Sequence, residues 1–291
     1  MEFNPLLKEQ VNPLSKFMRQ PKIYIRLPSN GNFWPEGSLV VSENGEYPVY
    51  SMTAKDELLL KIPDALMNGQ AVVDVIQNCI PNIKNAWHTP SIDVDAILIA
   101  IRMATYGEKM KVPFSLNENF DMEYQADLRI VMDKLLETIS WDPVVPINDE
   151  MTIFVKPINY KQMTKSALQT FETQKIMQVA NDDTINEEDK IQAFKNSFSK
   201  LTEVTIDMVG SSIFKIDTSN GSTDNERFIK EFVSNMDNDI FNKVQTHLDK
   251  LKEQNSVKSI NITVTEEMRA QGVTGETIEI PLVFDASTFF V

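Results

Sequence analysis

Hydrophobic and polar positions alternate in short stretches over the first part of the chain, up to about residue 157. Strand-like alternation runs through Lys22–Leu27 and stops at the turn cluster Pro28–Gly31. Leu39–Val41 and Tyr47–Tyr50 flank Asn44-Gly45, a favoured hairpin turn, so we expect these two stretches to pair.

Helical signals lie between the strand signals of this first part. Thr53 precedes the acids Asp56 and Glu57, as is typical of a capped helix start, and a helix is expected to follow through Leu58 and Leu66. Further helices are predicted over Gly69–Cys79, from Ser91 to a stop at Gly107, and over Asp127–Ile139. A hairpin is predicted from Val112–Leu116 and Phe120–Tyr124, and a strand over Thr152–Val155.

The second part, to about residue 256, has helical periodicity. Apolar residues step by three and four along one stripe, namely Ile191, Phe194, Phe198, Leu201, Val204 and Met208. We expect this stripe to be buried against a helix that begins at Tyr160 and holds Phe171, with the break between the two helices at Asn181–Asp183. A second helical stretch is predicted after Asn220–Thr223.

The third part returns to strand periodicity. Ile260–Val264 and Ile278–Leu282 are predicted to pair antiparallel through the loop that holds Gly272 and Gly275. An isolated two-stranded hairpin is marginal in water, so it needs a surface, either the chain's own first domain or a neighbouring protein.

These patterns together predict an α+β protein in three parts. Residues 1–157 form a mixed strand and helix N-terminal domain, residues 158–256 a helical, hairpin-like region, and residues 257–291 a C-terminal β-hairpin with an aromatic tail.

Composition and charge narrow the class of protein. The chain has 291 residues, with 28 Lys+Arg against 42 Asp+Glu, a net charge of −14. No concentrated basic patch offsets this charge, so nucleic acid is not expected as a partner. No apolar run reaches the ~20 residues of a membrane helix, and Met1–Leu6 does not resemble the start of a signal peptide. With one cysteine, Cys79, no internal disulfide is available, which fits either a reducing compartment or a fold that needs no disulfide.

Candidate chemistry is sparse. The sequence has no phosphate-binding or dinucleotide-binding glycine motif, no H-E-x-x-H and no G-x-S-x-G. Cys79 could pair with His88 in a nucleophilic site, but its apolar stretch is more typical of a core cysteine. Three carboxylate pairs are better explained as solvated helix starts: Asp93/Asp95, Asp182/Asp183 and Glu187/Glu188. We therefore expect no catalytic residues, no cofactor and no metal; one Cys and two His, His88 and His247, are too few for zinc.

Two aromatic pairs are candidate partner-binding residues. Phe33 and Trp34 follow the Pro28–Gly31 turn and are buried either in the protein's own core, the more common outcome, or in a partner's pocket. Phe289 and Phe290 stand near the C-terminus and need a surface to cover them, on their own chain or on a neighbour.

Several segments in order along the chain make a family resemblance. They are Leu27–Gly31, Met52–Glu57, Ala100–Gly107, Phe171–Gln174, Leu201-Thr202, Ser212-Ile213 and Phe284–Phe290. Through them the sequence resembles the baseplate hub subunit family of T-even-type contractile-tailed bacteriophages. Some relatives carry cysteine pairs in the hairpins that match Val112–Tyr124 and Ile260–Leu282, which implies a zinc knuckle in those relatives. This chain has no cysteine in either hairpin, so we expect no zinc.

The resemblance implies a non-enzymatic structural protein of the phage baseplate hub. Such a protein acts in tail assembly through contacts with other hub or tail proteins, including a tape-measure protein, in a hetero-complex or oligomer built in the host cytoplasm and kept in the virion. One alternative is an assembly chaperone of the hub or tape-measure protein that leaves before maturation. A third hypothesis, from a different class, is a hub-associated hydrolase of the cell wall.

Overall fold

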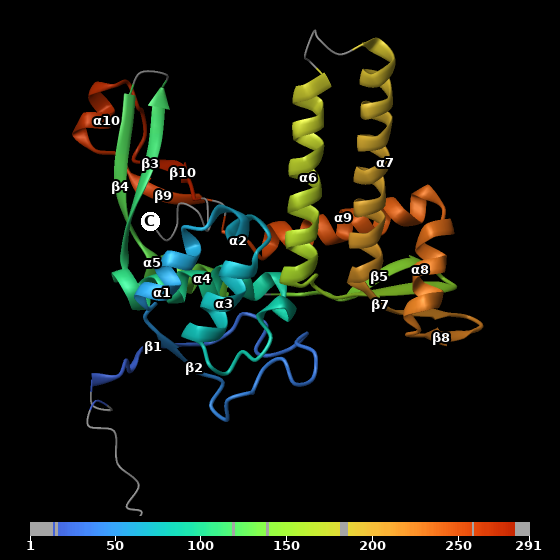
Figure 1. Ribbon diagram of the computed structural model, residues 1–291, viewed down its shortest axis with the longest axis horizontal. Coiled ribbons are helices and arrows are strands. Elements are labelled where there is room, and N and C mark those ends of the chain that lie inside the picture. Colours follow the sequence, from blue (N-terminus) through green and yellow to red (C-terminus); the bar gives the residue numbers. More distant parts are fainter. Residues whose placement is uncertain are drawn as a thin grey trace, which may run out of the picture.

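The computed structural model describes residues 14, 17–117, 120–137, 140–180, 186–257 and 259–282 (Figure 1). Short antiparallel strands alternate with helices along the chain, which confirms the α+β class. The elements of the N-terminal half are β1 (Pro21–Ile25), β2 (Tyr47–Tyr50), α1 (Ala54–Leu60), α2 (Pro63–Met67), α3 (Gln70–Cys79), η2 (Ala86–His88), α4 (Ser91–Tyr106), β3 (Lys109–Asn117), β4 (Phe120–Asp127), α5 (Leu128–Glu137), β5 (Val144–Asn148) and β6 (Met151–Val155). The C-terminal half contains α6 (Tyr160–Ala180), α7 (Glu187–Ser212), β7 (Ile213–Thr218), β8 (Gly221–Thr223), α8 (Glu226–Asn235), α9 (Asn238–Gln254), β9 (Ser259–Thr263), α10 (Glu266–Ala270) and β10 (Thr277–Pro281).

Helix α4 lies at the centre of the first of two hydrophobic cores. Ile97 and Ile101 lie on one face of the helix and Ile99 on the opposite face, and all three are fully buried, so α4 is covered on both sides. The covering elements include β1, β2, α3 and α5.

The C-terminal hairpin packs on this same first core. β9 and β10 pair antiparallel with Ile278 opposite Ile262 and Ile280 opposite Ile260, as predicted. Ile260, Ile262 and Ile280 are buried members of the first core. The surface that the hairpin needs is therefore the chain's own first core, and the short helix α10 fills the connection that was expected to be a simple bend.

A four-stranded sheet, in the order β5-β6-β7-β8, forms the second core with α7, α8 and α9. The buried residues Val145, Ile153 and Ile216 come from three of its strands. β7 and β8 lie inside the region predicted as helical. The helical periodicity of the sequence before and after these strands did not indicate them. β7 pairs with β6, although the whole α6–α7 hairpin lies between the two strands in the sequence.

Helices α6 and α7 pack antiparallel as a hairpin that projects from the body, and the β3–β4 hairpin points to the same side (Figure 1). The start of α6 is fixed to the first core, where the rings of Tyr160 and Trp87 lie 5.9 Å apart. The end of α7 is fixed to the second core through the buried side chain of Val209. The hairpin base therefore bridges the two cores.

The predicted burial of the α7 stripe is wrong in its outer half. Phe198 is 58% exposed and Ile191 is 52% exposed, whereas Ser197 is fully buried between the helices. The buried line of α7 passes through Ser197 and Val204, about a quarter turn away from Phe198. Phe171, on α6, is itself 39% exposed.

The pairing expected for Tyr47–Tyr50 is also wrong. This strand, β2, pairs with β1, while Leu39 forms an isolated bridge with Ile83. A turn at Gly45 exists, but only a local one, in which Gly45 N–H donates to Ser42 O. A second difference is that Pro63 begins a separate helix, α2, so that the helix capped by Thr53 ends at Leu60.

Candidate interaction surfaces

Trp34 is anchored by a buried carboxylate at the start of α4. Its indole Nε1 donates to Asp93 Oδ2 at 2.8 Å, and Ser29 donates to the same carboxylate through its backbone N (2.7 Å) and its Oγ (2.6 Å). We call Ser29, Trp34 and Asp93 the Asp93 cluster. It attaches the loop between β1 and β2 to the central helix, so Trp34 packs partly buried against the protein's own first core.

Asp93 is wholly inaccessible to solvent. Burial raises the pKa of its carboxyl group to about 6, and the hydrogen bonds from Ser29 and Trp34 offset part of that rise. Each of these hydrogen bonds stabilises the ionised form of Asp93. The cluster therefore favours a charged carboxylate at a buried position where desolvation disfavours the charge.

Phe33, the other half of the predicted pair, lies between the two cores. Its backbone adopts the left-handed conformation, with φ of 68°, which is uncommon for a residue with a large side chain. The ring meets Trp141 edge-on at 6.1 Å, and Trp141 Nε1 donates to Val155 O at 2.9 Å. Phe33 remains 37% exposed. Phe289 and Phe290 lie outside the described residues.

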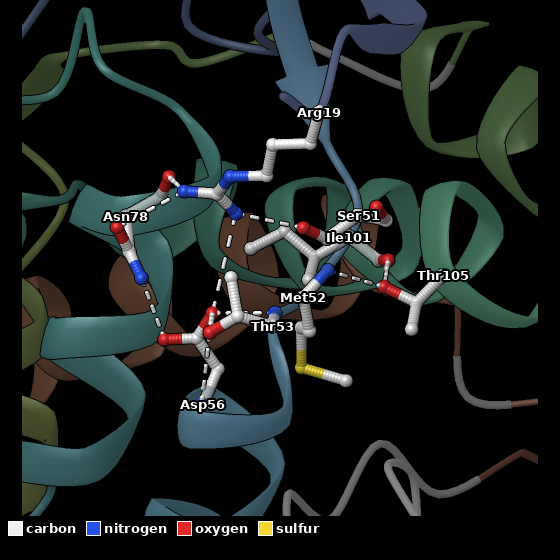
Figure 2. A network of polar contacts seen from close by, with 8 residues as sticks. All are labelled: Arg19, Ser51, Met52, Thr53, Asp56, Asn78, Ile101 and Thr105. Carbon is white, nitrogen blue, oxygen red and sulfur yellow. Dashed lines mark hydrogen bonds and ion pairs between the residues drawn. The ribbon is translucent and has the colours of Figure 1, made fainter. Parts of the chain in front are cut away.

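A second polar network ties Arg19 to the start of α1 (Figure 2). The Arg19 guanidinium donates to Ser51 O and to Asn78 O, each at 2.7 Å, and lies 4.0 Å from the carboxylate of Asp56. Asp56 is 1% exposed and accepts hydrogen bonds from Thr53 and Asn78, completing the helix cap predicted at Thr53.

The same region joins two segments that carry the family resemblance. Met52 N donates to Thr105 Oγ1 at 2.9 Å, and Thr105 Oγ1 donates to Ile101 O at 2.8 Å (Figure 2). Tyr106 Oη donates to Glu57 at 3.3 Å. The segments Met52–Glu57 and Ala100–Gly107 thus contact each other, and their polar residues hold the first core together.

The residues considered for nucleophilic chemistry have structural roles. Cys79 is fully buried, and burial raises the pKa of its thiol to about 12, so it stays protonated at neutral pH. His88 Nδ1 lies 2.7 Å from Ser38 Oγ, a hydroxyl that is itself buried. The prediction of a core cysteine is confirmed.

An open groove of about 520 Å³ lies between strand β5 and helix α9. Lys243 Nζ donates to Ile147 O at 3.0 Å and His247 Nε2 contacts Asp142 O at 2.9 Å, so both side chains are bound to the backbone beside the groove. Pro146, in β5, has no N–H to offer. This sheet edge is therefore shielded against pairing with another strand.

Apolar side chains remain exposed at two other places. On the outer face of the sheet, the rings of Phe154 and Phe214 lie 6.2 Å apart, with Lys215 Nζ 4.9 Å from the Phe154 ring centroid. On the α6–α7 hairpin, Ile191 and Phe198 are more than half exposed. Solvated aromatic groups of this kind are typical of protein–protein contact surfaces.

Two further searches cover the part of the chain that the structure describes. No helix there is both long and apolar enough to cross a membrane. No group of three or more His, Cys, Asp or Glu side chains there is placed to hold a metal ion.

The model of a family described as "T4 bacteriophage base plate protein" matches residues 18–290. Neither the curated proteins nor the solved structures contain a significant match.

Proposed function

Because this chain belongs to the T4 bacteriophage base plate protein family, we propose that it is a non-enzymatic structural subunit of the baseplate hub of a contractile-tailed phage. Membership makes it a structural baseplate component of the virion tail that contacts other tail proteins. The observation that carries the proposal is the extent of the match. Residues 18–290 include both cores and the projecting hairpin, so the whole described body is of the baseplate type.

The contacts made by the segments that carry the family resemblance support a structural rather than a catalytic role. Thr105 and Asp56 form internal hydrogen bonds that hold backbone, and Ser29 binds Asp93 inside the first core. Residues kept for chemistry would instead face an accessible cleft. The proposal that this subunit lies in the hub of the baseplate is supported by the ordered segments through which the sequence resembles the hub subunit family.

The alternative is an assembly chaperone of the hub or tape-measure protein that is absent from the mature virion. The exposed aromatic face of the α6–α7 hairpin favours this alternative as much as it favours a permanent subunit, because a transient partner needs the same kind of surface. Assembly in the host cytoplasm belongs to both versions, and the division into residues 1–157, 158–256 and 257–291 remains a proposal.

Quantitative mass spectrometry of purified virions tests the proposal. We expect peptides of this chain in virions and in isolated baseplates, at a constant ratio to an established baseplate protein. Peptides found only in infected-cell lysate and in assembly intermediates would indicate the chaperone. A zymogram on host cell wall tests the third hypothesis, and a cleared band from the purified protein would overturn a non-enzymatic role.

The terminal aromatics Phe289 and Phe290 stay proposed partner-binding residues, together with Phe33 and Trp34. Deletion of Thr288–Val291 distinguishes the two places where the rings could be buried. A lowered melting temperature assigns them to the chain's own core, and an unchanged melting temperature with blocked tail assembly assigns them to an interface. If the truncated protein melts normally and still yields infectious particles, neither assignment holds.

A further inference from the structure

The outer half of the α6–α7 hairpin has small polar residues between its helices and larger apolar residues outside. Ser197 is fully buried and Thr173 is 3% exposed, whereas Phe198 is 58% exposed. In a self-sufficient pair of helices the larger apolar side chains would fill the seam. This inversion indicates that the hairpin's largest apolar groups are placed to contact something beyond the hairpin.

An ion pair identifies the face on which Phe198 lies. Lys165 of α6 and Asp207 of α7 meet at 2.7 Å, which marks one broad face of the hairpin. Gln174 is nine residues after Lys165, and Phe198 is nine residues before Asp207. Nine residues are about two and a half helical turns, so both residues lie on the opposite broad face and at the same height.

That opposite face carries no charged residue along its centre. We call it the open hairpin face; it comprises Ala167, Thr170, Gln174, Ile191, Phe194 and Phe198. The α6 members are small or neutral and exposed, while the α7 members form an apolar ridge beside them. A ridge beside a row of smaller side chains is a surface on which the side chains of another helix can interdigitate.

Charge indicates the chemistry of that helix. Residues 160–180 and 190–212, the shaft of the hairpin, contain six lysines and three acidic residues, a net charge of +3 in a chain of net charge −14. Lys165 is paired with Asp207, whereas Lys195, about one turn before Phe198, has no acidic partner among the residues that the structure describes. Five further acidic residues of this region lie at the tip, in residues 182–189.

We propose that the open hairpin face binds one amphipathic α-helix of another tail protein. The apolar stripe of that bound helix lies on Phe198, and acidic residues of the bound helix flank the stripe. The origin of the helix in a tail protein rests on the proposed function. A second copy of this hairpin would bring two shafts of charge +3 together, so like charges disfavour it. The bound helix completes a three-helix arrangement and covers the side chains that the two-helix seam excludes.

Site-specific photocrosslinking in infected cells tests this pairing. A photoreactive phenylalanine analogue replaces Gln174, in the open hairpin face, and as the matched control Glu172, which lies on the opposite face two residues away. We expect crosslinks from position 174, at least about tenfold above those from position 172, to one helical segment of another tail protein with acidic flanking residues. A crosslink to a second copy of this chain, to nucleic acid or to a non-helical segment would overturn the proposal, as would equal yields from the two positions.

A pair of surface variants tests the same face by function. Phe198→Ser and the control Phe228→Ser replace rings of nearly equal exposure, 58% and 57%, on different helices. We expect both purified variants to melt like the wild type, and Phe198→Ser alone to lower infectious yield at least about tenfold in a complementation assay. Equal yields would overturn the proposal. Virions that contain the protein while position 174 gives no specific crosslink would refute this inference and leave the baseplate function standing.

Discussion

Replacing Trp34 by phenylalanine removes one hydrogen bond from the Asp93 cluster and keeps most of the apolar ring. The lost contact is the 2.8 Å bond from Trp34 Nε1 to Asp93 Oδ2, whose carboxylate has no access to water. Hydrogen bonds to charged groups contribute about 1.5–3 kcal/mol. Ser29 Oγ still donates to Asp93 Oδ2, but no solvent reaches that oxygen to replace the indole donor. We expect Trp34→Phe to lower the free energy of unfolding by about 2–3 kcal/mol at pH 7.5.

Urea denaturation followed by far-UV circular dichroism measures this loss without relying on tryptophan fluorescence. The matched control is Trp141→Phe, which removes an indole donor from a neutral acceptor, Val155 O at 2.9 Å, and should cost about 0.5–1.5 kcal/mol. Ser29→Ala combined with Trp34→Phe forms a double-mutant cycle, and the two changes should not be additive, because both donors serve one carboxylate.

The pH dependence provides a second test of the same reasoning. The pKa of Asp93 is raised to about 6 in the folded protein, so the group is largely protonated at pH 4.5 and ionised at pH 7.5. The bond to Trp34 is charge-assisted only in the ionised form, so the loss on Trp34→Phe should shrink at the lower pH. A loss below 0.5 kcal/mol at pH 7.5, or an equal loss at both pH values, would refute this account of the cluster.

Three further predictions concern the first core. Burial raises the pKa of Asp95 to about 6, so the folded state binds this proton more tightly than the unfolded chain and stability falls as pH rises from about 4 to 6. The free energy of unfolding of Asp95→Asn, relative to that of the wild type, should therefore rise by about 1–2 kcal/mol between pH 4 and pH 7. Urea denaturation measures it, and the same difference between the two proteins at both pH values would contradict this prediction. Gly69→Ala would place a Cβ 2.9 Å from Thr164 Oγ1 at a φ of +78°, so its melting temperature should fall further than that of Gly37→Ala, where φ is +77° and no atom lies within 4 Å. Asp56→Ala would leave Asn78 Nδ2 and the Thr53 backbone N–H without their acceptor, and should cost about 2–4 kcal/mol in urea denaturation, against less than 1 kcal/mol for the exposed Asp64→Ala.

The sequence predicted correctly those elements that are determined by residues close to one another along the chain. The cap at Thr53, the helix stop at Gly107 and the antiparallel pairing of Ile260–Val264 with Ile278–Leu282 follow from side-chain chemistry within a few residues, or from a period that one buried face imposes. The sheet that unites β5, β6, β7 and β8 could not be found in that way. β6 and β7 are separated along the chain by the whole helical hairpin, and nothing local to Ile213 signals its partner.

The apolar stripe of α7 shows a different limit of sequence reasoning. The steps from Ile191 through Phe198 are those of an amphipathic helix, and that period is present. The period identifies an apolar face but not what covers it, since a face for the core and a face for a partner have the same pattern. Ser197, buried in place of Phe198, carried no signal in the sequence. Among the predicted site residues, Trp34 lies against the core, yet its bond to Asp93 joins residues 59 positions apart and was beyond local inference.

The bridging base of the α6–α7 hairpin has a mechanical consequence. The start of α6 moves with the first core and the end of α7 moves with the second, so any rotation between the cores must slide one helix along the other. Packed helices tolerate only small sliding displacements before their side chains must repack. A ligand that contacts both helices along the shaft would resist that sliding, and would fix the angle between the two cores from a distance. Occupancy of the hairpin would thus set the rigidity of the whole subunit.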